Sequence, residues 1–167
     1  SGDNNVSVID IKKNSVIKTI EVGALPLGIA INPANKRAYV ANHDDGTVSV
    51  IDTANDSVVS TIKVGNSPWY IGLDSAKNRI YVTNRGDNTV SVINTADNRV
   101  VETIKVGAQP LGIAVDADNN RAYVANHKDL SVSIIDTKNN KAIGEVKLSF
   151  TDLDSSYVGS PWGVAVY

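Results

Sequence analysis

The sequence predicts an all-β fold made of about four tandem copies of one 42-residue unit. The block Val-Ser-Val-Ile-Asp, or a close variant of it, begins at Val6, Val48, Val90 and Val132. A second block, Arg-x-Tyr-Val-x-Asn, begins at residues 37, 79 and 121 with the same spacing. Chance does not produce two blocks in one register. Residues 1–167 therefore form a single repeat domain, with units that start near residues 6, 48, 90 and 132.

Each unit contains four short runs rich in β-branched residues, separated by clusters of Asn, Asp and Gly. In the best-defined unit these runs are Trp69–Leu73, Arg79–Asn84, Thr89–Thr95 and Val100–Val106. Helical periodicity is absent. Short runs joined by tight turns are typical of an antiparallel meander, so we name the four expected strands of a unit A, B, C and D in that order.

Strand A combines large residues with very small ones. Gly28 and Ala30 alternate with Ile29 and Ile31, and the same alternation recurs at residues 112–115. The inner strands of a β-propeller need small side chains because neighbouring sheets approach one another near the shared axis. The repeat therefore predicts a β-propeller whose blades are four-stranded antiparallel sheets of 42 residues each.

The connections between the strands support this prediction. Between strands A and B, residues 32–36 and 116–120 are rich in Asn and Asp, which tolerate left-handed backbone. Between strand D and the next strand A stands Val-Gly-x-x-Pro, at residues 22–26, 64–68 and 106–110. Glycine permits the sharp bend, and proline begins the strand where no ladder donor is required.

The Tyr-Val-Ala-Asn and Tyr-Val-Thr-Asn blocks, together with Val-Ser-Val-Ile-Asp and Val-Gly-x-x-Pro, resemble the YVTN-type β-propeller repeat family. The resemblance covers almost the whole chain. Members of that family are secreted, periplasmic or cell-surface proteins of bacteria and archaea, including seven-bladed surface-layer proteins. The resemblance implies an extracytoplasmic propeller, but such repeats support many roles, so function has to be argued from the site.

Alignment of the units places the start of the chain just before a strand C, and its end, residues 161–166, in a strand A. Four units would then lack only the turn and strand that correspond to residues 117–126. Because a missing strand leaves ladder edges unpaired, we expect a piece of a seven- or eight-bladed propeller or a ring that a partner chain completes. The last unit also carries an insertion near residues 149–157, which is either a binding loop or neutral drift.

Composition excludes several classes of function. The formal net charge is −2, which leaves no basic footprint for nucleic acid and disfavours an anionic membrane surface. The chain has no cysteine, so disulfides, thiolate metal sites and a cysteine nucleophile are excluded. No apolar run is long enough to span a bilayer in this segment.

One repeat position carries the candidate binding residues. His43, Arg85 and His127 each follow the Asn that ends strand B. The D-to-A loops should emerge on the same face and bring Trp69 and Trp162 to the mouth of the central channel. Aromatic and basic groups could together receive a ligand there, although solvated turn residues are the simpler interpretation. His43 and His127 lie two blades apart, too far for one metal ion, so no metal site is predicted.

Other motifs give weaker indications of function. Arg85-Gly86-Asp87 matches the tripeptide of adhesive ligands, but Gly-Asp-Asn recurs at residues 2–4, so an ordinary turn is the better explanation. Asp44 and Asp45 offer too few oxygens for Ca²⁺. Asp74 and Asp116 end adjacent inner strands on the opposite face, where capping of the A-to-B turns explains them. No spacing singles out a catalytic constellation, so no catalytic residue and no cofactor are predicted.

These observations favour a non-enzymatic extracytoplasmic propeller that binds protein or glycan through a loop face. A cofactor-binding or enzymatic propeller with a site at the channel mouth is the first alternative, since quinoprotein, haem and lactonase propellers resemble this architecture. A structural module that self-associates through open blade edges is the second.

Overall fold

A computed structural model describes residues 3–149 and 161–166. The described residues contain fourteen β-strands and no helix. Most of the predicted insertion near residues 149–157 lies outside the described part of the chain. No described helix could cross a membrane.

The strands form one two-stranded hairpin and three four-stranded antiparallel sheets, each in the order of the sequence. The hairpin pairs β1 (Asn5–Asp10) with β2 (Ser15–Glu21). The first complete blade contains β3 (Pro26–Asn32), β4 (Arg37–Asn42), β5 (Thr47–Asp52) and β6 (Ser57–Lys63). The second contains β7 (Pro68–Asp74), β8 (Arg79–Asn84), β9 (Thr89–Asn94) and β10 (Arg99–Lys105), and the third β11 (Pro110–Asp116), β12 (Arg121–Asn126), β13 (Ser131–Asp136) and β14 (Lys141–Lys147).

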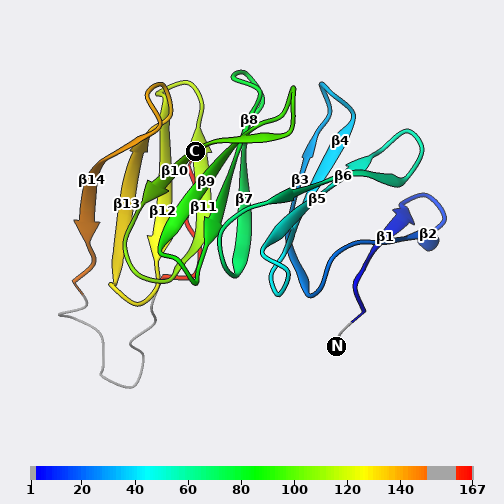
Figure 1. The fold of residues 1–167 in the computed structure, drawn as a ribbon, viewed down its shortest axis with the longest axis horizontal. Helices are drawn as coiled ribbons and strands as arrows, with labels where there is room; N and C mark the ends of the chain where they lie inside the picture. Colours follow the sequence, from blue (N-terminus) through cyan, green and yellow to red (C-terminus); the bar gives the residue numbers. More distant parts are fainter. Residues whose placement is uncertain (1–2, 150–160, 167) are drawn as a thin grey trace.

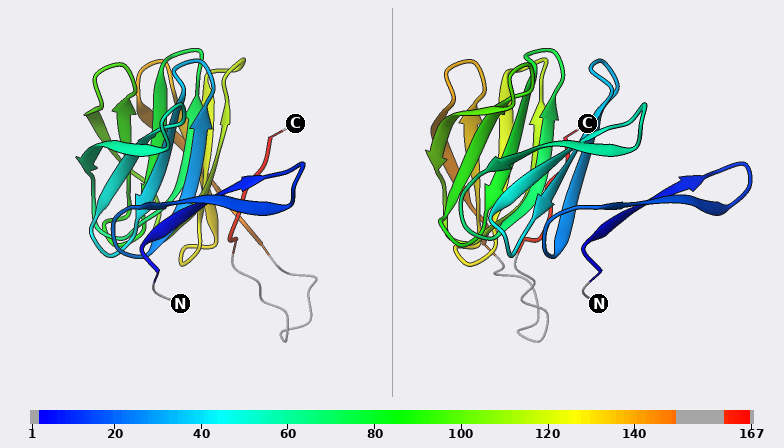
Figure 2. Two further views of the ribbon diagram at one scale, coloured as in Figure 1. Left: turned by 90° about the vertical axis from the view of Figure 1, so that its right-hand side faces the viewer. Right: turned by 45° about the vertical axis from the view of Figure 1, so that its right-hand side comes forward.

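The blades are arranged radially, and their first strands are the inner ones. Strand β7 packs against both β3 and β11, its counterparts in the neighbouring blades. Figure 1 shows the three blades side by side, and Figure 2 shows the β1–β2 hairpin projecting from the first of them. The prediction of a partial β-propeller with four-stranded antiparallel blades is confirmed, and the predicted strand ends are correct to within about one residue.

The core lies between the blades. One cluster joins Tyr39 and Val50 of the first blade to Ile71, Ile80 and Val82 of the second. A second cluster joins Tyr81 and Val92 of the second blade to Ile113 and Val124 of the third, with other buried residues. Both faces of the second blade's sheet are therefore buried, as expected for a sheet that packs between two neighbouring blades.

The small residues of the inner strands permit this packing. A Cβ atom on Gly28 would stand 2.6 Å from the carbonyl oxygen of Trp69 and 2.8 Å from the Cα of Tyr70, both in the next blade. On Gly72 it would stand 2.9 Å from Cγ2 of Val115. Only glycine fits these contacts without a shift, which explains the alternation of large and small residues in strand A.

Left-handed residues close the turns. Positive φ values occur at Lys36, Asn78 and Asn120 in the A-to-B turns, and at Asn14, Asp56, Asn98 and Asn140 in the C-to-D turns. Asn and Asp hold most of these positions because their short polar side chains tolerate this conformation.

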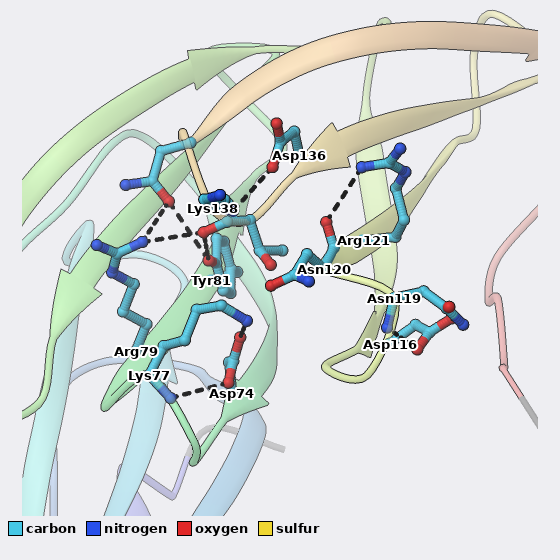
Figure 3. A network of polar contacts seen from close by, with 12 residues as sticks. Asp74, Lys77, Arg79, Tyr81, Asp116, Asn119, Asn120, Arg121, Asp136 and Lys138 are labelled. Atoms are coloured by element: carbon cyan, nitrogen blue, oxygen red, sulfur yellow. Dashed lines mark hydrogen bonds and ion pairs between the residues drawn. The ribbon is translucent and has the colours of Figure 1, made fainter.

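A polar network also joins the second blade to the third (Figure 3). Nη1 of Arg79 donates to the carbonyl oxygen of Thr137 and to Oδ1 of Asn140, each at 3.0 Å. The hydroxyl of Tyr81 donates to Oδ1 of Asn140 at 3.4 Å. Burial of the Tyr81 side chain raises the pKa of its hydroxyl.

One side of β3 is not covered by another described strand. Ile29 and Ile31 are 47% and 58% exposed. Together with Val6, Val8 and Ile51 they line an apolar groove of about 390 Å³ between the β1–β2 hairpin and the first blade.

Candidate functional site

Two kinds of loop meet on one face of the propeller: the B-to-C turns and the D-to-A loops. The amide of His43 donates to the carbonyl of Leu25 at 3.0 Å, and the amides of Arg85 and His127 make the corresponding bonds to Ser67 and Gln109 at the same distance. The repeat thus fixes the backbone of each basic residue beside the D-to-A loop of its own blade. Leu25, Ser67 and Gln109 all have positive φ, immediately before the proline that begins strand A.

A bulge turns the start of each inner strand toward this face. In the second blade Pro68 pairs with Asn84, but regular pairing resumes only at Ile71, which leaves Trp69 and Tyr70 out of register. Such irregularities redirect side chains at the ends of sheets. Thr83 stabilises the bulge, because its Oγ1 accepts from the Tyr70 amide at 3.0 Å and donates to the Leu111 carbonyl at 2.7 Å.

The structure brings the five predicted site residues into a row that crosses the blades. The ring of His43 meets Trp69 edge-on, with ring centroids 5.5 Å apart. The guanidinium of Arg85 lies over the same indole at 5.6 Å, a cation–π contact. His127 meets Trp162 edge-on at 5.3 Å. The row therefore has two aromatic centres, one at each of two blade boundaries.

Gln109 lies between these two centres, and sequence reasoning did not single it out. Its Oε1 accepts from Nη2 of Arg85 at 3.4 Å, while its backbone amide donates to Oδ1 of Asn88 at 2.9 Å. Arg85 of the second blade thus reaches across to the loop that leads into the third. Because Leu25 and Ser67 occupy the same repeat position, only comparison of the three loops could have indicated this residue.

The imidazole of His43 is held in one orientation. Its Nδ1 lies 2.7 Å from Oδ1 of Asp44. Its Nε2 has essentially no exposed surface and no hydrogen-bond partner in the described part of the chain. Neither water nor a substrate can reach this nitrogen unless a neighbouring side chain moves.

Three aspartates two residues further along the same turns support the D-to-A loops. Oδ2 of Asp45 accepts from the Ala24 amide at 2.7 Å, Oδ2 of Asp87 from the Asn66 amide at 2.7 Å, and Oδ2 of Asp129 from the Ala108 amide at 2.6 Å. The 42-residue spacing of these carboxylates was the signal that sequence reasoning missed.

The contacts of Asp87 bear on the Arg-Gly-Asp tripeptide. Its Oδ1 also accepts from Nδ2 of Asn66 at 2.8 Å, so the carboxylate is already occupied within the propeller. Arg85 is directed toward Trp69 and Gln109. The tripeptide therefore forms an ordinary turn of the propeller. This agrees with the sequence interpretation that explained it as a turn.

The Asn that ends strand B is structural. Asn42, Asn84 and Asn126 are completely buried. In the second blade Nδ2 of Asn84 donates to Oγ1 of Thr89 at 3.0 Å and to Oγ of Ser91 at 2.8 Å. Gly65 packs directly on this amide, since a Cβ there would stand 2.7 Å from the Asn84 Cγ. The repeated Asn and the repeated Gly therefore pack against each other.

The opposite face contains capped turns. The backbone amide and Nζ of Lys77 bond to the buried Asp74 carboxylate at 3.0 and 2.9 Å. The side-chain and backbone amides of Asn119 hold Asp116 and keep the pKa of its carboxyl below the usual range. Figure 3 shows the two pairs in separate turns. Among the described residues, no three His, Cys, Asp or Glu side chains are grouped as a metal site would require.

Comparison with known proteins assigns the family. Residues 57–156, more than half of the chain, match the family described as "Lactonase, 7-bladed beta-propeller". The chain belongs to this lactonase family. A search among curated proteins found no match.

Solved structures agree with this family's architecture. Hydrazine synthase of Kuenenia stuttgartiensis is similar to this lactonase-family propeller with a TM-score of 0.70 and 25% sequence identity. The match covers 74% of this chain but only 36% of the hydrazine synthase chain, so the propeller described here spans about a third of that protein.

Proposed function

We propose that this chain is a non-enzymatic binding propeller of the YVTN type, located outside the cytoplasm, which engages protein or glycan through the face of its B-to-C turns and D-to-A loops. The observation that carries the proposal is the row of His43, Trp69, Arg85, His127 and Trp162 along one face, with one aromatic centre on either side of the boundary between the second and third blades. Aromatic and cationic side chains on a rigid framework are the groups that dominate recognition surfaces.

Trp162 is the residue that a ligand can reach most easily. Its side chain is 65% exposed. The Trp69 indole, in contrast, is in contact with both His43 and Arg85. An indole that lies open beside a histidine offers a flat apolar surface with a polar neighbour, which suits a sugar ring or a peptide side chain.

The test compares the full chain with Trp162→Ala on a glycan array and in capture from cell-surface extracts. Val101→Ala is the matched control, because Val101 is an exposed apolar residue on the outer strand β10, away from this face. A ligand retained by the wild type and by Val101→Ala but lost by Trp162→Ala supports the proposal. Equal retention by Trp162→Ala, or no ligand on the wild type in either format, would count against it.

Lactone hydrolysis is a second candidate, favoured by the family and by the pairing of His43 Nδ1 with Asp44 at 2.7 Å. A histidine oriented by a carboxylate can act as a general base through its other nitrogen. This candidate ranks second because Nε2 of His43 is buried. Hydrolysis of gluconolactone followed in a pH-stat, with loss of the rate in His43→Gln, would place it first.

Self-association is a third candidate, favoured by the exposed Ile29 and Ile31 in the groove beside the β1–β2 hairpin. Apolar surface of this kind promotes association between chains. Light scattering over a range of concentrations tests it. Ile31→Asp should shift the oligomers toward monomer, whereas a wild-type monomer at every concentration would eliminate this candidate.

A further inference from the structure

A small polar pocket lies where the second and third complete blades meet. It has a volume of about 220 Å³ and is lined by Arg85, Gly86, Asn88, Ala108, Gln109 and Lys128. Pockets for whole small molecules are larger, about 300–1,000 Å³. The size therefore suits one functional group of a larger ligand.

The charge of this pocket is positive. It is lined by two cations and no carboxylate. Neither Arg85 nor Lys128 forms an ion pair with any described residue. The nearby Asp87 and Asp129 already accept hydrogen bonds from the loop amides of Asn66 and Ala108. An anion would supply the negatively charged partner that neither cation has among the described residues.

Arg85 is held in place for this purpose. Its guanidinium rests over Trp69 at 5.6 Å and donates from Nη2 to Gln109 at 3.4 Å. A guanidinium has five N–H donors, so this single bond leaves most of them available. Its planar fork matches the oxygens of carboxylate or sulfate groups, and restraint before binding reduces the entropy that binding costs.

The pocket is specific to this boundary rather than a product of the repeat. At the preceding boundary the position of Arg85 is held by His43, and the position of Lys128 in the following blade is held by Gly86. There Asp44 lies 2.7 Å from the His43 ring and supplies negative charge. The pair of cations occurs once among the described blades.

An aromatic surface adjoins the pocket. Lys128 follows His127, whose ring packs against the exposed Trp162 at 5.3 Å. A ligand with its anionic group in the pocket can therefore extend over His127 toward the indole. Sugar rings stack their C–H faces on exposed indoles, so an acidic saccharide can occupy the pocket and this surface together.

We propose that Arg85 and Lys128 bind the carboxylate or sulfate group of an acidic saccharide, and that Trp162 receives a sugar ring of the same ligand. This inference rests on the proposed binding function and specifies its ligand. It assigns the charged group to Arg85 and Lys128, and the ring to Trp162.

The experiment measures binding of the full chain to oligogalacturonate, to a sulfated heparin oligosaccharide, to a neutral malto-oligosaccharide of similar length, and to polyglutamate as an acidic peptide. We expect one or both acidic saccharides to bind and the neutral one to bind at least tenfold more weakly. Binding should weaken as salt is raised. The two acidic saccharides distinguish carboxylate from sulfate recognition.

Variants then test the residues. Arg85→Gln and Lys128→Gln should each weaken binding about tenfold, the usual effect of removing a charge-assisted hydrogen bond. Arg85→Lys should recover part of the affinity. Lys105→Gln on β10 is the matched control, because it removes one exposed charge outside the pocket and should leave binding unchanged.

Equal affinity of the Arg85→Gln, Lys128→Gln double variant and the wild type would overturn this inference. So would binding of polyglutamate in preference to every saccharide, which would leave the proposed function intact with a protein ligand. If the wild type retains no glycan and no protein in any format, the proposed function itself fails.

Discussion

Replacing Gly28 with alanine should weaken the packing between the first two complete blades and destabilise the fold. The new Cβ would stand 2.6 Å from the Trp69 carbonyl oxygen, about 0.8 Å closer than the 3.4 Å at which ordinary contact begins. It would also stand 2.8 Å from the Cα of Tyr70. Both neighbours are backbone atoms of an inner strand, so no flexible side chain can move aside. The strands themselves must shift.

The free-energy cost of this substitution depends on the side chains that pack beside the contact. Strands β3 and β7 meet at the blade boundary whose core contains Tyr39, Val50, Ile71 and Val82, packed with almost no exposed surface. Overpacking that forces backbone shifts typically costs about 1–3 kcal/mol. We place Gly28→Ala near 3 kcal/mol, because a shift of the inner strand also loosens the contacts between the side chains of both blades.

Gly144→Ala provides the matched control. Gly144 also lies in a strand, β14, but a Cβ there would meet only Cδ1 of Ile134, at an ordinary 3.8 Å. Alanine at such a site is neutral or stabilises by up to about 1 kcal/mol through the unfolded chain. Urea denaturation followed by tryptophan fluorescence and circular dichroism compares the midpoints. If Gly28→Ala unfolds at the wild-type midpoint or above it, the inference that the inner strands require glycine is refuted.

Three further predictions follow from buried and capping groups. Asn84→Ala should lower the free energy of unfolding by about 2 kcal/mol in urea denaturation, because the buried Asn84 amide loses its hydrogen bonds to Thr89 and Ser91; an unchanged midpoint would contradict this. Hydrogen bonds from asparagine side chains keep the pKa of the Asp116 and Asp136 carboxyls below the ordinary 3.8. These carboxylates should therefore stabilise the fold fully above pH 3.8, and this contribution should be lost as the pH falls further. A urea midpoint that stays constant from pH 5 to pH 2 would contradict this. Burial raises the pKa of Tyr81 above 10.0, so the wild type should lose stability above pH 10 more steeply than Tyr81→Phe, as urea midpoints would show.

The fold could be predicted from the sequence because the repeat supplied three or four aligned copies of each local signal. A single Val-Ser-Val-Ile-Asp run is compatible with many β structures, but its recurrence at 42 residues fixed the unit and its strands. The alternation at Gly28, Ile29, Ala30 and Ile31 then indicated a radial arrangement, and the contacts of Gly28 with Trp69 explain why. In a repeat protein each unit contacts only its neighbours, so local pattern and overall architecture are closely linked.

The site was less predictable, because its members belong to different blades. Sequence position placed His43, Arg85 and His127 on one face, and the loops placed Trp69 and Trp162 near them. It could not show that two histidines and two indoles would pair across blade boundaries. The bulge that directs Trp69 toward the face arises from the pairing of β7 with β8, which only three-dimensional register reveals.

The same repeat that determines the framework also leaves particular positions free to differ between blades. The Asn84 amide and the Asp87 carboxylate are occupied by the framework, and both are repeated in every complete blade described. The side chain at position 85 has no such structural role, because it is the backbone amide of this residue that bonds to the D-to-A loop of its own blade. The side chain at this position differs between blades, as His43, Arg85 and His127, and can change without loss of the fold, which is what the proposed ligand contact of Arg85 requires.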